Sequence, residues 1–357
     1  MINVTKTELP ALEDYNKKLQ EIWESGWITN NGNQLVSLEE KLKDYLGVKH
    51  IFLVSNGTIA LQLAIRVLDL KNKEVITTPF SYVATLNALL WEGAIPVLAD
   101  IDPITGNLDP KRVKEKISTK TKAILPVHVY GQPADISGFS ELSAEYDLPV
   151  VYDAAQAFGS TYQSKPLAQF GTLSCYSFHA TKIFHTIEGG AIATNDSSLA
   201  SKLNHLRHFG HKGDDYYGIG INAKMSEMHA AMGHLILPMV DSSIEKKKKI
   251  WMLYDQALER THLNSSLSEN FDLCQINYSY FPYLFSSEKE LKHKMDLLEK
   301  QNIIARRYFF PSFTALPHFK SVPMAIADDL AKRVVCLPLG DDMTPELVDQ
   351  ICKILKQ

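Results

Sequence analysis

The sequence predicts an α/β protein with a mostly parallel central sheet, helices on both faces and a smaller C-terminal α+β unit. Short β-rich runs alternate with helical patterns through the first two-thirds of the chain, which is typical of such sheets. The alternation ends near residue 245, where a long helical pattern begins. The chain has 357 residues, enough for about two or three domains. We therefore expect a large domain over 1–245 and a small one over 246–357.

The first part of the chain supplies the predicted sheet. A helix is expected over about 9–24, a strand at "HIFLV" (50–54) and a helix over 58–70. The strand-like runs "EVITT", "AIPVLADI", "AILPVHVYG", "LPVVYDAA", "LSCYSF" and "GGAIAT" follow, with helices in "SYVATLNALLWEG" and near 136–146. In such sheets ligands bind beyond the carboxyl ends of the strands. The first site candidates are therefore the polar residues that follow strands: Ser55, His128, Asp153 and Ser177.

The last third predicts the smaller α+β unit. "SSIEKKKKIWMLYDQAL" reads as a long helix, and its lysines at 246–249 are interpreted as a solvated face rather than a nucleic-acid site. "FPYLFS", the helical "SEKELKHKMDLLEKQ", "IIARRYFF" and the terminal helix "TPELVDQICKIL" complete the unit. No repeat or linker separates the two units, so we expect them to pack firmly together.

Composition narrows the class of protein. The net charge is −4 and the pI about 6.3, so no basic field favours nucleic acid or an anionic membrane. No targeting signal and no stretch of roughly 20 apolar residues is visible, so we expect a cytoplasmic protein. The four cysteines form no CxxC pair, which argues against a disulfide framework or a zinc site.

Three segments carry candidate chemistry. In "VSNGTIALQLAI", Gly57 and Thr58 sit at a strand-to-helix turn that could hold a phosphate on free N–H groups. The alternative is a plain turn with Thr58 as the helix N-cap. In "VVYDAAQAFGS", Asp153 follows an apolar strand, where a carboxylate needs a cationic or hydrogen-bonding partner; the alternative is a helix-capping aspartate. In "LSCYSFHATK", Ser177 ends a strand and Lys182 follows.

Lys182 alone would be interpreted as a surface lysine, but its neighbours match one cofactor. Pyridoxal phosphate needs an amine for its aldehyde, an anion for its pyridinium proton and donors for its phosphate. Lys182, Asp153 and the turn at Gly57 supply these three, and Tyr82 in "FSYVATLN" offers an aromatic face. The combination predicts a pyridoxal-phosphate site.

These segments resemble the DegT/StrS family of pyridoxal-phosphate-dependent nucleotide-sugar aminotransferases, which have the aspartate-aminotransferase fold (fold type I). The resemblance covers nearly the whole chain. The pair "DAAQAFGS" and "SFHATK…EGG" is its most specific part, and it is joined by "ESGWITNNG", "TTPFSYVATLNA", "PVHVYGQPADI", "GINAKMSEMHAAMG", "RRYFFP" and "CLPLGDDMT".

The resemblance implies roles for individual residues. Lys182 would carry the cofactor as a Schiff base and then move a proton, and Asp153 would pair with the ring nitrogen. The other implied cofactor contacts are Tyr82 stacked on the ring, Gln156 near its hydroxyl, and Gly57, Thr58, Ser177 and Asn222 at the phosphate. Asn222 would come from the neighbouring subunit of a homodimer with a shared active site. Many relatives have arginine where Lys224 stands, so the role of that position stays open.

The resemblance also implies a reaction. L-Glutamate would give its amino group to a nucleotide-linked keto sugar. Relatives that deoxygenate sugars carry histidine at the Schiff-base position, so Lys182 favours transamination. "HTIEGG", rather than the "GAYGDxG" of C3 aminotransferases, favours amination at C4. The best interpretation is dTDP-4-keto-6-deoxyglucose converted to dTDP-4-amino-4,6-dideoxyglucose for bacterial surface polysaccharide such as O-antigen.

Several alternatives stay open. The substrate could be a UDP-, GDP- or 3-keto sugar, and a non-catalytic regulatory protein could share the fold. His185, Arg306 and Arg307 are candidate substrate contacts, since arginine suits a diphosphate, but surface salt bridging explains the arginines equally well. The histidines of "HLRHFGH" lack a nearby carboxylate, so no metal is expected.

Overall fold

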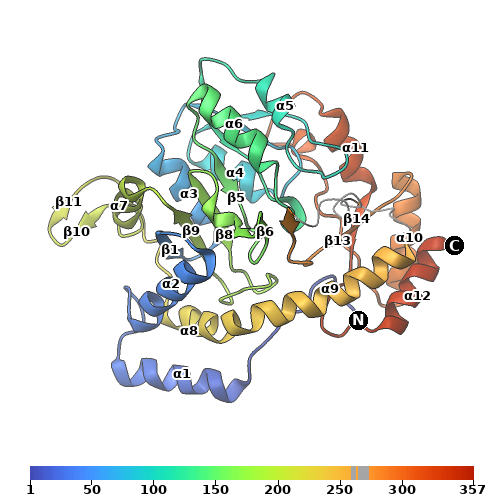
Figure 1. Cartoon of the computed structure of the whole chain (residues 1–357), viewed down its shortest axis with the longest axis horizontal. Helices are drawn as coiled ribbons and strands as arrows, with labels where there is room; N and C mark the ends of the chain where they lie inside the picture. The colour runs from blue at the N-terminus through green and yellow to red at the C-terminus, as the bar shows by residue number, and fades with distance from the viewer. Residues whose placement is uncertain (259–262, 264–272) are drawn as a thin grey trace.

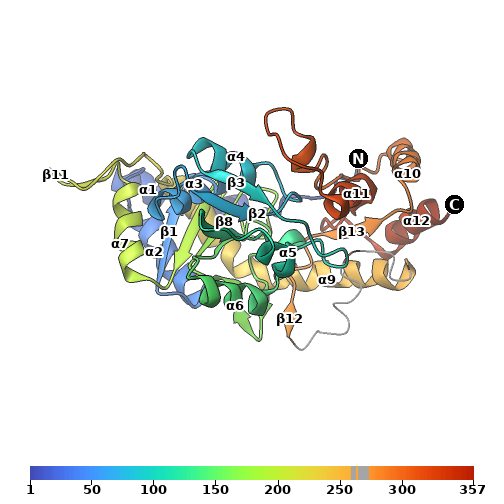
Figure 2. The same cartoon turned by 90° about the horizontal axis from the view of Figure 1, so that it is seen from above.

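The computed structural model describes residues 1–258, 263 and 273–357 and has a central sheet with helices on both faces (Figures 1 and 2). One part of the sheet has the strand order β1-β9-β8-β5 and the other β3-β2-β4. The strands are β1 (His50–Val54), β2 (Glu74–Thr77), β3 (Ile95–Leu98), β4 (Thr121–Leu125), β5 (Val151–Asp153), β8 (Leu173–Ser177) and β9 (Gly190–Thr194).

The two parts are joined between β4 and β5, where parallel bridges link Ile124 to Val150 and Val127 to Asp153. Strand β9 runs antiparallel to β1 and β8, whereas β2 pairs in parallel with β3 and β4, and β5 with β8. The mostly parallel α/β sheet that the sequence predicts is therefore confirmed. The carboxyl ends of β1, β5 and β8 share one edge, because both Val54 and Ser177 pair with Gly190.

Two apolar layers cover the sheet, because successive residues of a strand point to opposite faces. In β5 and β8, Tyr152 and Tyr176 enter one buried cluster, and Val151 and Cys175 enter the other. The helices of the large unit are α1 (Leu12–Ser25), α2 (Asn33–Leu46), α3 (Gly57–Val67), α4 (Ala84–Trp91), α5 (Pro110–Lys114), α6 (Ile136–Tyr146), α7 (Ser197–Leu206) and α8 (Glu227–Ile236).

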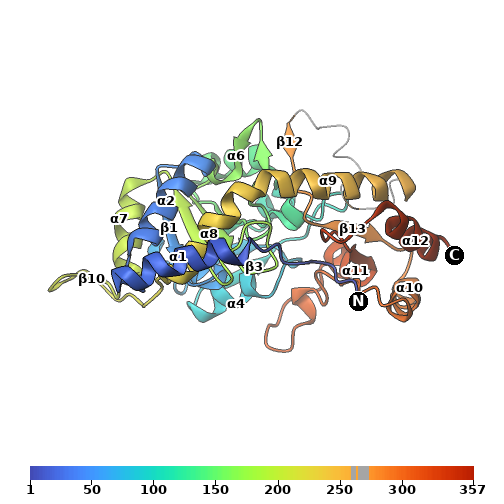
Figure 3. The ribbon, with the colours of Figure 1, turned by 90° about the horizontal axis from the view of Figure 1, so that it is seen from below.

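The smaller unit contains the antiparallel strands β13 (Phe281–Leu284) and β14 (Val334–Leu337) with the helices α10 (Glu288–Lys300), α11 (Ala325–Arg333) and α12 (Pro345–Lys356). Helix α9 (Val240–Ala257) runs from the large unit along the small one (Figure 3). This helix crosses the domain boundary predicted between residues 245 and 246. The division into domains at that point stays a prediction. The first residues of the chain join the small unit, since Ile2 bridges Ile303.

Short elements lie outside what periodicity predicts: β6 (Thr161–Tyr162), β7 (Lys165–Pro166), β12 (Cys274–Gln275), and β10 (His211–Lys212) with β11 (Asp215–Tyr216), which form a projecting hairpin (Figure 1). The lysine run on α9 is not uniformly solvated, because Lys247 is half-buried and its amine donates a hydrogen bond to the Leu339 carbonyl at 2.9 Å. Within the described part of the chain, no helix combines the length and apolarity needed to cross a membrane.

Candidate active site

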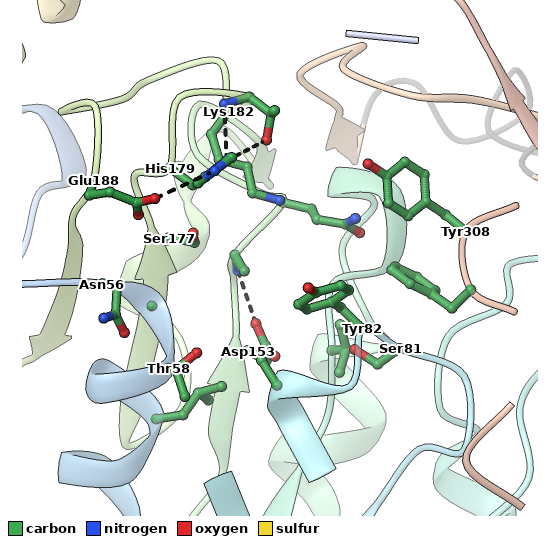
Figure 4. Close-up of a pocket in the computed structure, with 18 of the residues that line it drawn as sticks. Asn56, Thr58, Ser81, Tyr82, Asp153, Ser177, His179, Lys182, Glu188 and Tyr308 are labelled. Carbon is green, nitrogen blue, oxygen red and sulfur yellow. Dashed lines mark hydrogen bonds and ion pairs between the residues drawn. The ribbon is translucent and has the colours of Figure 1, made fainter. Parts of the chain in front are cut away.

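A cavity of about 260 Å³ lies at the carboxyl edge of the sheet, beyond β1, β5 and β8 (Figure 4). The cavity gathers side chains that are far apart in the sequence. Its lining includes most of the site residues predicted from the sequence: Gly57, Thr58, Tyr82, Asp153, Gln156, Ser177, Lys182 and Arg306.

The N-terminus of α3 forms one end of the cavity. The Asn56 side chain caps the helix and accepts the N–H of Ile59 at 2.9 Å. The alternative of Thr58 as N-cap is therefore wrong, and Thr58 lines the cavity instead. The first N–H groups of a helix have no acceptor within it, which suits a bound anion. Gly57 leaves room, since a Cβ there would lie 2.8 Å from the Cβ of Ser177.

Asp153 ends β5 and is buried. Its carboxylate accepts hydrogen bonds from the Thr85 hydroxyl at 2.7 Å and the Ala155 N–H at 3.1 Å, and the Ser81 hydroxyl lies 2.8 Å from that of Thr85. Burial raises the pKa of the Asp153 carboxyl, and the bonds from Thr85 and Ala155 oppose that shift. The residues directly after Asp153 form turns rather than the start of an α-helix, so the helix-capping alternative is wrong. The carboxylate faces the cavity without an ion-pair partner among the described residues.

Lys182 lies in the loop between β8 and β9, which folds over the cavity (Figure 4). Its backbone N–H is fixed by the His179 carbonyl at 2.8 Å, and its amine donates to the Tyr280 hydroxyl at 3.3 Å. Burial lowers the pKa of the Lys182 amine, whereas Tyr308 and Asp153 oppose this shift. The amine is therefore closer to its neutral form than an ordinary lysine.

Tyr82 and Gln156 stand on the wall of the cavity. Tyr82 is 57% exposed, so its ring is free to cover a planar ligand. Gln156 is buried, and its side-chain oxygen accepts the backbone N–H of Tyr130 at 2.8 Å. This bond fixes the amide plane, so the amide nitrogen is left to donate to another acceptor. The roles assigned to these two residues stay predictions.

The three candidate substrate contacts, Arg306, Arg307 and His185, do not all lie at the cavity. Arg306 lines the cavity, with its guanidinium 4.6 Å from the ring centre of Tyr308. Arg307 turns away and binds Glu288 at 3.1 Å. His185 is 1% exposed; its Nε2 lies 2.7 Å from the Glu8 carbonyl, and its Nδ1 accepts the Ile187 N–H at 3.3 Å. The structure thus brings only Arg306 of the three to the cavity.

Asn222 and Lys224 lie outside the cavity lining of this chain. Asn222 is exposed, and its side-chain oxygen accepts from the Lys224 amine at 2.7 Å. The Lys224 amine also lies 5.0 Å from the ring centre of Phe209, and burial lowers its pKa. Lys224 therefore contacts the Asn222 amide in this chain, and the role of the position stays open.

Sequence reasoning missed several residues of the site. Thr85, Tyr280, Tyr308 and the pair His179–Glu188, separated by 3.6 Å, all contact predicted site residues or line the cavity. His179 and Glu188 stand inside the segment 177–194, where their closeness to Lys182 is a usable signal. Tyr280 carries no such signal.

The residues present fit pyridoxal phosphate. A helix N-terminus without room for a Cβ suits its phosphate, a buried carboxylate without an ion pair suits its ring nitrogen, and an amine with a lowered pKa suits its aldehyde. Among the described residues, no group of three or more His, Cys, Asp or Glu could hold a metal.

Comparisons with known proteins agree with this site. The profile of the DegT/DnrJ/EryC1/StrS aminotransferase family matches residues 11–356. A dTDP-4-amino-4,6-dideoxy-D-glucose transaminase of Shigella dysenteriae is 39% identical, over 100% of this chain and 98% of that protein. A GDP-perosamine synthase of Escherichia coli O157:H7 is 32% identical, over 98% and 96%. The crystal structure of DesI with its TDP-sugar product superposes with a TM-score of 0.92 at 29% identity, over 99% and 92%.

Proposed function

Because this chain belongs to the DegT/DnrJ/EryC1/StrS aminotransferase family, we propose that it moves an amino group from L-glutamate to dTDP-4-keto-6-deoxyglucose. The chain is a pyridoxal-phosphate-dependent aminotransferase of fold type I. The observation that carries the proposal is the meeting of an amine (Lys182), a buried carboxylate (Asp153) and a helix N-terminus in one cavity.

The chain's own residues divide the work of the reaction. When bound, pyridoxal phosphate supplies an electron sink for the carbon from which a proton is removed. Asp153 would hold the proton on the ring nitrogen. Lys182 would take a proton from the donor carbon, and its lowered pKa favours the neutral amine that this requires. Gly57, Thr58 and Ser177 would hold the phosphate group.

The sugar nucleotide is proposed from likeness. The relative named for a dTDP-linked 4-amino sugar is 39% identical, whereas the relative named for a GDP-linked sugar is 32% identical. Arg306 lines the cavity without an ion-pair partner among the described residues and would contact the nucleotide diphosphate. The amino sugar would serve a bacterial surface polysaccharide such as O-antigen. The cytoplasmic location and the homodimer stay predictions.

A direct assay tests the proposal. The purified protein is incubated with pyridoxal phosphate, glutamate and a panel of dTDP-, UDP- and GDP-linked keto sugars, including a 3-keto isomer, and mass spectrometry detects the amino sugar. We expect a 4-amino dTDP sugar from the native chain. Lys182→Ala removes the amine and should lower turnover by about 10³-fold or more. Lys289→Ala, which changes an exposed lysine, is the matched control.

The possible outcomes test the nucleotide, the position of amination and the catalytic activity separately. Product from another nucleotide alone would retain the aminotransferase and replace the substrate. Product from the 3-keto isomer alone would replace C4 amination. If no panel member is aminated and glutamate leaves the cofactor spectrum unchanged, the chain would instead be a non-catalytic protein of this fold.

A further inference from the structure

The amine of Lys182 has one hydrogen-bond partner among the described residues, and it comes from the smaller unit. The amine donates to the Tyr280 hydroxyl at 3.3 Å. Tyr280 directly precedes β13, 98 positions after Lys182 in the chain. The lysine that reacts therefore depends on a side chain that no motif around it contains.

Tyr280 is fixed from several sides. It is 4% exposed, and its carbonyl accepts the indole N–H of Trp251 on α9 at 3.2 Å. Its ring stands perpendicular to that of Tyr308 at 5.7 Å between centres, and tilted against Tyr130 at 5.8 Å. A ring held in this way can place its hydroxyl at one point, so the Lys182 amine meets a preorganised partner.

Gln156 supports the same hydroxyl. Its side-chain oxygen is occupied by the Tyr130 N–H, so its amide nitrogen is the end available to Tyr280. A hydrogen bond from Gln156 favours the ionised form of Tyr280, but burial is the larger effect and raises the pKa of this phenol. Tyr280 is therefore a neutral hydroxyl at ordinary pH.

A neutral partner suits an amine that must act as a base. A carboxylate at the same place would hold the lysine as an ammonium ion, which has no lone pair to accept a proton. A hydroxyl can accept a hydrogen bond from either protonation state of the amine. It thus keeps the amine in place and favours the ammonium form far less than a carboxylate would.

We propose that Tyr280 is a positioning residue whose hydroxyl holds the free amine of Lys182 at the cavity during turnover. The amine is free whenever the donor or the sugar has taken its place, and its four-carbon stem would otherwise move among rotamers. The hydroxyl would return it to the same position for each proton transfer. This assignment deepens the proposed function and rests on it for the glutamate reaction.

Tyr280→Phe tests the proposal because it removes only the hydroxyl and keeps the ring contacts. Tyr254→Phe is the matched control. Tyr254 is also buried, packs 5.0 Å from Phe281, and its hydroxyl has no partner among the described residues. Two readouts are compared: the rate at which glutamate changes the spectrum of the holoenzyme, and the pH midpoint for acylation of Lys182 in the full-length chain freed of cofactor, followed by peptide mass spectrometry.

We expect Tyr280→Phe to slow the glutamate reaction about 10-fold to 100-fold, because the amine loses its fixed position. The acylation midpoint of Lys182 should move to lower pH, since the hydroxyl that stabilises the ammonium form is gone. The other groups that act on this amine, Tyr308, Asp153, Tyr82 and Arg306, stay in both variants. Tyr254→Phe should match the native chain in both readouts.

The proposal is overturned if Tyr280→Phe matches Tyr254→Phe in both readouts. Should the phenylalanine variant fail to fold, 4-aminophenylalanine at position 280 replaces it, with the same shift in midpoint expected and an unchanged midpoint counting against the role. If the native chain itself does not react with glutamate, the proposed donor fails, while the acylation midpoint still decides the role of Tyr280.

Discussion

His128 illustrates how a buried residue can make the molecule sensitive to acid. Its ring is 0% exposed and stacks on Tyr152 at 4.6 Å between centres. Its Nδ1 accepts the N–H of Ala134 at 2.9 Å, so the proton of the neutral ring lies on Nε2, which has no partner in the described part of the chain. Burial lowers the pKa of His128 to about 3. The folded protein therefore holds this ring neutral where the unfolded chain would protonate it.

The sign of the resulting pH dependence follows. Between a pH of about 6.5 and the lowered pKa of about 3, the unfolded chain binds a proton at His128 that the folded chain does not. This residue should thus reduce the free energy of unfolding as the pH falls, by about 1.4 kcal/mol per pH unit. His128→Asn keeps an acceptor for Ala134 but removes the titration. The variant should be less stable than the native chain at pH 7. The difference in the free energy of unfolding between the two, measured by urea unfolding, should narrow toward pH 5. A gap that stays constant over this range would contradict the argument.

Single residues of the site were predictable where their position in the chain carried information. Asp153 and Ser177 end the apolar strands β5 and β8, and Lys182 stands five residues after Ser177. Tyr280 and Thr85 were not predictable in this way. Both reach the site through folding alone, Thr85 from within α4 and Tyr280 from the smaller unit. A tyrosine or threonine in such a segment carries no functional signal of its own.

Helix α2 begins without a capping side chain of its own. Its N-cap position is Gly32, and the acceptor comes instead from Glu227 at the start of α8. The Glu227 carboxylate, which is buried, accepts the N–H groups of Gln34 at 2.7 Å and Leu35 at 3.2 Å. A Cβ on Gly32 would lie 2.5 Å from this carboxylate, so the glycine makes room for it. Two helices distant in sequence are thereby joined end to end.

We expect Glu227→Ala to lower the free energy of unfolding by about 1–3 kcal/mol, because it leaves the buried N–H of Leu35 and the half-buried N–H of Gln34 without an acceptor. Glu24→Ala, at an exposed position on the neighbouring α1, should change it by less than about 0.5 kcal/mol. Thermal unfolding of the two variants and the native chain measures the difference. Equal melting temperatures for the two variants would show that water replaces the Glu227 carboxylate as the cap.

Elements were predictable where a period repeats over several residues. The helix expected near 136–146 is α6 (Ile136–Tyr146), and the strand expected at 50–54 is β1. The two-residue strands β6, β7 and β12 are too short to show a period. The direction of β9 was also out of reach, because an apolar run such as "GGAIAT" reads alike in parallel and antiparallel pairs.

At the scale of the whole molecule, the N-terminal segment ties the two units together. Ile2 and Val4 pair with Ile303 and Leu339 of the smaller unit. A few residues later, the Glu8 carbonyl meets the His185 ring in the loop that carries Lys182. The predicted division at 245/246 assigns the first residues to the large domain, although they pair with the smaller unit. Pairing between residues about 300 positions apart leaves no trace in local sequence patterns.

In the predicted homodimer, the partner chain would supply Asn222, which lies outside the cavity lining of its own chain. Asn222 is exposed outside the cavity, on the segment that carries the projecting β10–β11 hairpin (Figure 1). Tyr216 and Ile219 on this segment are 77% and 81% exposed, a large apolar exposure for a surface in water. A second copy of the chain that covers this segment would bring Asn222 to the phosphate site of its partner.

Mixing two inactive variants tests this sharing. Lys182→Ala lacks the amine, and Asn222→Asp places a negative charge beside the phosphate, so each homodimer should be inactive. In a mixed dimer, one site combines both defects and the other has neither. Equal amounts, unfolded and refolded together, should therefore recover about a quarter of native turnover. A mixture of Lys182→Ala with Asp153→Asn is the control, because both residues belong to the same chain's site and no mixed dimer contains an intact one. No recovery in the first mixture would show that each chain completes its own site. Recovery in the control would show that Lys182 and Asp153 do not act in the same chain's site, which would contradict the arrangement assumed here.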